Sequence, residues 1–245
     1  MKEDTNMKKT LKLSIVALAI AGSVNAFADK IKDGLEPEEG VIGWTPIAIG
    51  LATPIQLPYG LNRWDVHGID FNLFYSDAPE MIGLDAGGFA TVVRQDMVGV
   101  QAGGFVNFNC CDVYGVRGTL GLNWCGQTAH GVDFGLCSFG DKFYGAELYA
   151  LGSIQRDVTG FAFSGLANVT ENQSYGCTIA LGTNLAKVAY GFQGAIVFNM
   201  TEELHGAQLG LVNWATECPS GFQIGLVNII LDNRIKVLPF VNGFF

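Results

Sequence analysis

Two nearly identical stretches near the C-terminus decide the fold: GAQLGLVN at residues 206–213 and GFQIGLVN at residues 221–228. Each begins with glycine, alternates apolar residues with small or polar ones, and ends with asparagine. The two leading glycines are 15 residues apart. A fixed period of this length is the signature of a protein built from structural repeats.

The same leading glycine recurs along most of the chain, at intervals of 14 to 16 residues. So regular a spacing indicates a real repeat, even in a chain that contains 33 glycines. We call these residues the repeat glycines: Gly68, Gly83, Gly99, Gly115, Gly131, Gly145, Gly160, Gly176, Gly191, Gly206 and Gly221.

Apolar and polar residues alternate with a period of two inside each repeat. In the first repeat, Ile69, Phe71 and Leu73 alternate with Asp70 and Asn72. This period is typical of a β-strand with one apolar face and one polar face. We therefore predict two-faced strands, joined by short charged linkers of roughly equal length that form solvated turns.

The N-terminus is typical of an exported protein. Residues 7–28 contain three lysines, an apolar core and the small-residue pattern Ala26-Phe27-Ala28, which predicts a signal peptide cleaved after Ala28. Residues 29–40 are charged and are expected to form a flexible leader. Residues 41–245 are predicted to form a single repeat-built β domain.

Composition excludes several classes of function. Cleavage would remove four lysines and two acidic residues, leaving ten basic and 21 acidic residues and a net charge of −11. So acidic a chain is a poor candidate for binding nucleic acid. No later stretch approaches 18 consecutive apolar residues, so no membrane-spanning helix is expected.

Six cysteines follow the predicted signal peptide. Their even number permits disulfides in an exported protein, yet a chain of this length can build a core without them. Both states remain open, and the spacing fits no zinc site. The cysteines are Cys110, Cys111, Cys125, Cys137, Cys177 and Cys218.

Two further residue types recur at fixed positions. A ring often precedes the repeat glycine, and we interpret these rings as strand-end side chains at a membrane–water interface or stacked along the repeat, not as metal ligands. Asparagine recurs seven or eight residues after the glycine, as a turn residue or as a ladder of amides. The rings are His67, Tyr114, His130, Tyr144, Tyr175, Tyr190 and His205; the asparagines are Asn107, Asn123, Asn168, Asn184, Asn199, Asn213 and Asn228.

Catalytic chemistry has little support in the sequence. The inward positions hold Asp70, Arg117, Asp133 and Glu147, which we interpret as single polar residues that line a lumen. The segments around Cys137 and Ser164 miss the pattern of a nucleophile elbow, and no metal-site or phosphate-binding motif is present. We predict no catalytic, cofactor-binding or metal-binding residues, no cofactor and no enzymatic activity.

The C-terminal sequence VLPFVNGFF ends on Phe245 with apolar residues at alternate positions. This ending resembles the insertion signal of bacterial outer-membrane β-barrels, although Gly243 and Pro239 depart from it. The GxQxGxxN repeats, with the upstream PIQLP segment and the closing LPFxNxxF, resemble exported bacterial surface-repeat proteins. That resemblance implies a surface location and no known chemistry.

Two architectures fit these features. We expect an antiparallel transmembrane β-barrel of about 12–14 short strands, because the signal peptide, strand length and terminal phenylalanine suit one. The alternative is a β-solenoid, favoured by the equal linkers. The barrel predicts a non-enzymatic structural protein or small pore in the outer membrane of a Gram-negative-type bacterium, with membrane lipid and the barrel-assembly machinery as partners. The solenoid predicts an exported, soluble or surface-attached protein with an adhesive or structural role.

Overall fold

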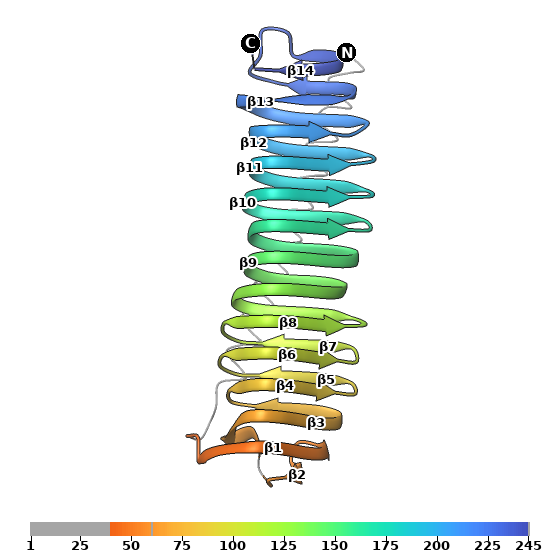
Figure 1. Ribbon diagram of the computed structural model, residues 1–245. Helices are drawn as coiled ribbons and strands as arrows, with labels where there is room; N and C mark the ends of the chain where they lie inside the picture. The colour runs from red at the N-terminus through yellow and green to blue at the C-terminus, as the bar shows by residue number, and fades with distance from the viewer. Residues whose placement is uncertain (1–39, 60, 245) are drawn as a thin grey trace.

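The computed structural model describes residues 40–59 and 61–244 and shows an elongated rod of stacked coils (Figure 1). The predicted signal peptide and residues 29–39 of the predicted leader lie outside the described residues, as does Phe245. The elements are β1 (Gly43–Ala52), β2 (Ile55–Leu57), η1 (Leu61–Arg63), β3 (Trp64–Ala78), β4 (Met81–Gly87), β5 (Ala90–Val93), β6 (Met97–Gly103), β7 (Val106–Asn109), β8 (Val113–Thr119), β9 (Leu122–Ser164), β10 (Ala167–Ala180), β11 (Thr183–Ala195), β12 (Phe198–Leu209), β13 (Val212–Ile230) and β14 (Val237–Gly243).

Successive repeats pair in parallel and in register. Gly176 of β10 pairs with Gly191 of β11, which pairs with Gly206 of β12. The same register aligns the asparagines, so that Asn184 pairs with Asn199. Each repeat therefore forms one turn of a β-solenoid, and residues of one repeat position form a column along the rod.

The antiparallel transmembrane β-barrel expected from the sequence is wrong. All pairs between neighbouring repeats from β3 to β13 are parallel. In a solenoid each repeat completes one coil, and the next repeat starts directly above the start of the previous one. The connections between repeats therefore have nearly constant length, as the linkers of this chain do. A barrel instead alternates short turns with long loops. The solenoid alternative is the observed fold.

Only glycine fits the repeat-glycine position, because the backbone there has a positive φ and the preceding coil lies very close. Gly191 has φ 115°, a conformation that residues with a Cβ rarely adopt. A Cβ atom at this position would collide with the carbonyl oxygen of Gly176, and the same collision recurs along most of the column. The spacing of these glycines therefore records the length of each coil.

The asparagine column forms the hydrogen-bonded ladder that the sequence allowed. Nδ2 of Asn168 donates to Oδ1 of Asn184 at 2.9 Å, and Asn184 donates to Asn199 at 3.0 Å. Asn184 also donates to the carbonyl oxygen of Gly194 at 2.7 Å. Each amide thus joins two coils and satisfies a backbone carbonyl of the turn, which a buried polar group requires.

The interior of the solenoid is polar on one side and apolar on the other. Beneath the strands that follow the repeat glycine lie buried polar residues, including Gln193, Gln208 and Gln223. The opposite side holds clusters of buried apolar residues, such as Leu204 with Ala189 and Ala215. The strand alternation places polar side chains inside and apolar ones outside over half of the coil.

Both ends of the rod are closed by strands that break the repeat. At the first coil, β1 pairs in parallel with β3, and β2 folds back against β1. At the last coil, β14 pairs antiparallel with β13, with Val241 opposite Ile224. Such terminal strands cover sheet edges that would otherwise pair with other chains. The aromatic C-terminal strand, interpreted from the sequence as a barrel signal, is this cap.

Candidate functional site

The most distinctive surface of the rod is an exposed apolar face that runs along its whole length. It consists of the first, third and fifth residues after each of the eleven repeat glycines, and all 33 are Ala, Gly, Cys, Val, Ile, Leu or Phe. Many of the large ones are exposed, among them Phe71 at 52%, Leu209 at 49% and Phe222 at 46%. We call these positions the apolar face.

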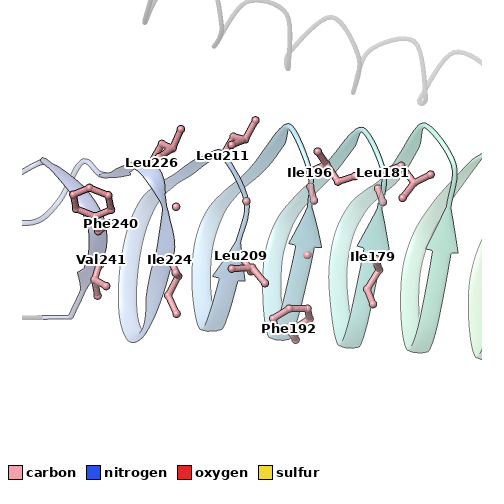
Figure 2. A pocket seen from close by; sticks show the side chains of 15 residues that line it. Ile179, Leu181, Phe192, Ile196, Leu209, Leu211, Ile224, Leu226, Phe240 and Val241 are labelled. Carbon is pink, nitrogen blue, oxygen red and sulfur yellow. The ribbon is translucent and has the colours of Figure 1, made fainter.

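A groove of about 810 Å³ lies on the apolar face near the C-terminal end. It forms because Gly194, Gly210 and Gly225 lie between larger side chains of neighbouring coils. All of its lining residues are apolar or glycine. Figure 2 shows two rows of them: Leu181, Ile196, Leu211 and Leu226 along the turns, and Ile179, Phe192, Leu209, Ile224 and Val241 on the strands.

The rings predicted to precede the repeat glycine form a stacked column beside the apolar face. Tyr175 and Tyr190 stack with ring centroids 4.5 Å apart and nearly parallel planes. Tyr190 in turn stacks on His205 at 4.6 Å. A second run joins Tyr114 to His130 at 4.9 Å. We call this set the ring column: His67, Tyr114, His130, Tyr144, Tyr175, Tyr190 and His205.

Each strand runs from a charged turn through the ring column into the apolar face. In one coil the order is Lys187, Tyr190, Phe192 and then Ile196 at the next turn. The charged linkers between repeats lie above one another along the rod and form what we call the charged edge. At this edge an acidic side chain of one coil contacts the backbone of the next coil. Oδ1 of Asp157, for example, accepts a hydrogen bond from the backbone N–H of Gln173 at 3.1 Å. The rings thus mark the boundary between charged and apolar surface.

The inward charges predicted from the sequence do not line an open lumen. Arg117 and Asp133 lie opposite each other on neighbouring coils, are buried, and form an ion pair in which Nε of Arg117 donates to Asp133 at 3.0 Å. Burial alone would lower the pKa of Arg117, but the charge and hydrogen bonds of Asp133 raise it above its usual value. The pair is a structural element of the interior.

Three other buried carboxyl groups, those of Asp70, Asp85 and Glu147, have raised pKa values. Burial raises the pKa of Asp70 to about 6, although hydrogen bonds from Ser76 and Asn72 oppose the rise. Burial and the nearby charge of Asp70 raise the pKa of Asp85 to about 7. Burial likewise raises the pKa of Glu147 to about 8. These carboxyl groups lie inside the coil, beneath the strands that follow the repeat glycines.

Asp85 was not singled out from the sequence, although its position could have identified it. It is the second residue after a repeat glycine, the same position as Asp70, Arg117, Asp133 and Glu147, and it pairs with Asp70 on the neighbouring coil. A column traced from the repeat period would have included it.

The three histidines lie on different coils and are not brought together. His67 is in a group with Asp65 and Glu80 whose ligand atoms all lie within 4.8 Å of one another. Nε2 of His67 is 3.7 Å from Oε2 of Glu80, an ion-pair distance if the histidine is protonated. Donor sets of this kind are common on surfaces without a metal, and the absence of metal sites stays a prediction.

The thiol and hydroxyl groups considered as nucleophiles are not activated. None of the six cysteines forms a disulfide, so none of the bridges that the sequence permitted is present. Burial raises the pKa of Cys137, which disfavours its thiolate. Ser164 is buried and its hydroxyl donates to Oδ1 of Asn168 in the interior.

The apolar face bordered by the ring column is therefore the candidate site, and its chemistry suits the binding of an apolar partner. Within residues 40–59 and 61–244, no helix is long and apolar enough to span a membrane. Comparison of the chain with protein-family models, curated proteins and solved structures gives no match.

Proposed function

We propose that this chain is an exported, surface-attached β-solenoid with a structural or adhesive role and no enzymatic activity. The solenoid fold supports a rigid, elongated element. The predicted signal peptide at residues 7–28 supports export, and the resemblance to exported bacterial surface-repeat proteins supports a location at the cell surface.

The observation that carries this proposal is the uninterrupted apolar face. With coils about 4.8 Å apart and about 3.3 Å per residue, it measures roughly 50 by 13 Å, on the order of 600 Å² in projection. The largest apolar patches of soluble monomers are of about this size and are often functional. Covering about 600 Å² would contribute on the order of 15 kcal/mol before the cost of association is subtracted.

The remaining architecture suits a structural role. The ladder of asparagines, the stacked rings and the repeat glycines make every coil dependent on its neighbours, as in other repeat proteins. The buried polar residues form hydrogen bonds largely with one another; Gln223, for example, donates to Gln208 at 2.8 Å.

The barrel-assembly machinery was expected as a partner only because a barrel was expected.

Fractionation of expressing cells tests the proposal. We expect the protein in the envelope fraction, resistant to a wash with about 1 M salt, because apolar attachment is not screened by ions. Leu209→Glu, at the central strand position of the apolar face in the groove near its C-terminal end, should release it. Asn172→Glu adds the same charge at an exposed residue of the charged edge and should leave it attached. Wild-type protein found wholly in the soluble fraction would refute surface attachment.

A further inference from the structure

We infer that the partner of the apolar face is a lipid bilayer, on which the rod lies with the ring column at the level of the lipid headgroups. This inference rests on the proposed surface attachment and specifies what the rod attaches to. The apolar face would contact acyl chains, and the charged edge would remain in water.

The first argument is the inverted polarity of the coil. Where the strand alternation exposes Leu209 and Phe222, it buries Gln208 and Gln223. In a water-soluble β-protein the polar residues of such strands face the solvent and the apolar ones face the core. Apolar residues outside with polar residues inside are the arrangement of strands that contact lipid.

The second argument is the position of the ring column. Tyrosine and other amphipathic rings are enriched at membrane–water interfaces, where an apolar ring with a polar atom is favoured. Tyr175 and Tyr190 lie between the charged edge and the apolar face, and Tyr175 is 41% exposed. Seven of the eleven coils carry such a ring, and the rings of two runs of three coils stack on one another at one level of the rod.

The third argument concerns shape and separates lipid from a second copy of the chain. The third position after the repeat glycine varies without order between large and small residues, as in Gly118, Phe134 and Gly194. Stable protein interfaces need complementary surfaces packed as closely as a protein interior. Fluid acyl chains adapt to an uneven surface, and the groove beside Leu209 offers them an apolar recess (Figure 2).

The charged edge adds a prediction about the headgroup. Acidic residues such as Asp112, Asp157 and Glu217 outnumber basic ones in the turns that precede the ring column. They would lie just outside the headgroup layer, where anionic lipid repels negative charge within a Debye length of about 10 Å at 0.1 M salt. Uncharged phosphatidylcholine should therefore bind better than mixtures rich in phosphatidylglycerol.

Flotation with phosphatidylcholine vesicles tests the inference. Protein purified from expressing cells should float with the vesicles, and an equal admixture of phosphatidylglycerol should reduce the bound fraction several-fold at low salt. Leu209→Glu should reduce binding at least tenfold, and Asn172→Glu should not. Circular dichroism establishes that both variants retain the solenoid.

A fluorescent reporter keeps the inference testable if Leu209→Glu fails to fold. In Leu211→Trp the indole is placed on the apolar face, and its emission should shift to the blue and be quenched by brominated acyl chains. In Asn172→Trp, on the charged edge, neither change should occur. Equal quenching at both positions would overturn the proposed orientation.

Sedimentation velocity separates failure of this inference from failure of the proposed function. A protein that does not float but forms a dimer abolished by Leu209→Glu would overturn the lipid assignment, because the apolar face would bind a second copy while still serving for attachment. A monomer that neither floats nor remains with the cell envelope would overturn both.

Discussion

Nδ2 of Asn199 donates a hydrogen bond to Oδ1 of Asn213, one coil further along the rod, at 2.9 Å. The same Nδ2 donates to the carbonyl oxygen of Leu209 at 2.8 Å. Both hydrogens of the amide are therefore used, one for the next asparagine and one for the turn. The buried asparagine column thus holds neighbouring coils in register and satisfies turn carbonyls that water does not reach.

Replacing a member of this column should destabilise the fold. We expect Asn199→Ala to lower the free energy of unfolding by about 1–3 kcal/mol, because two buried acceptors lose their donor. Asn199→Asp should cost more, since a carboxylate would face Oδ1 of Asn213. Urea denaturation followed by circular dichroism measures both changes. If Asn199→Ala costs no more than the exposed substitution Asn172→Ala, the ladder is not a source of stability.

The repeat glycine should tolerate no side chain. We expect Gly191→Ala to cost more than the roughly 1–3 kcal/mol typical of a strained backbone position, because its Cβ would also meet the carbonyl oxygen of Gly176. Gly40→Ala is the matched control, since a Cβ there meets no atom within 4 Å. Thermal unfolding compares the two variants. Equal melting temperatures would show that the contact between coils relaxes without cost.

The buried ion pair should behave as a unit. Arg117→Met leaves the carboxylate of Asp133 buried without its partner, and we expect a loss of about 3–5 kcal/mol. The double variant Arg117→Met with Asp133→Leu should recover most of that loss, because no unpaired charge remains. A double-mutant cycle from urea denaturation gives the coupling energy. Additive losses would mean that the two residues contribute independently.

Much of the fold could be predicted from residue positions. The repeat glycines gave the correct period, and Ile69, Phe71 and Asp70 were assigned to the correct faces of a strand. The alternation ends at the turns, so that Val197 is exposed although a period of two continued from Gln193 would place it inside. A period of two describes a strand and carries no information about the bend that follows it.

The direction of pairing could not be read from the alternation, because parallel and antiparallel strands both alternate with a period of two. The decisive signals were the equal linkers and the recurrence of one residue type at one position. Tyr175 and Tyr190 stack only if successive repeats run the same way. The apolar C-terminal strand pointed to a barrel because a strand that caps the rod has the same sequence pattern.

The raised pKa values of three interior carboxyl groups, those of Asp70, Asp85 and Glu147, predict that stability falls as pH rises. A glutamate in the unfolded chain has a pKa of 4.5, whereas burial in the folded protein raises the pKa of Glu147 to about 8. The pKa values of Asp70 and Asp85 rise from 3.8 to about 6 and about 7. Between about pH 4 and pH 8 the folded state therefore binds more protons than the unfolded state. The free energy of unfolding should decrease over this window, by up to about 1.4 kcal/mol per pH unit for each carboxyl group that is protonated only in the folded state.

Glu147→Gln keeps the shape of the side chain and cannot ionise, so its urea midpoint should depend less on pH and exceed that of the wild type at pH 8. A wild-type midpoint that rises from pH 5 to pH 8 would contradict this reasoning, because the interior would then stabilise the charged carboxylates.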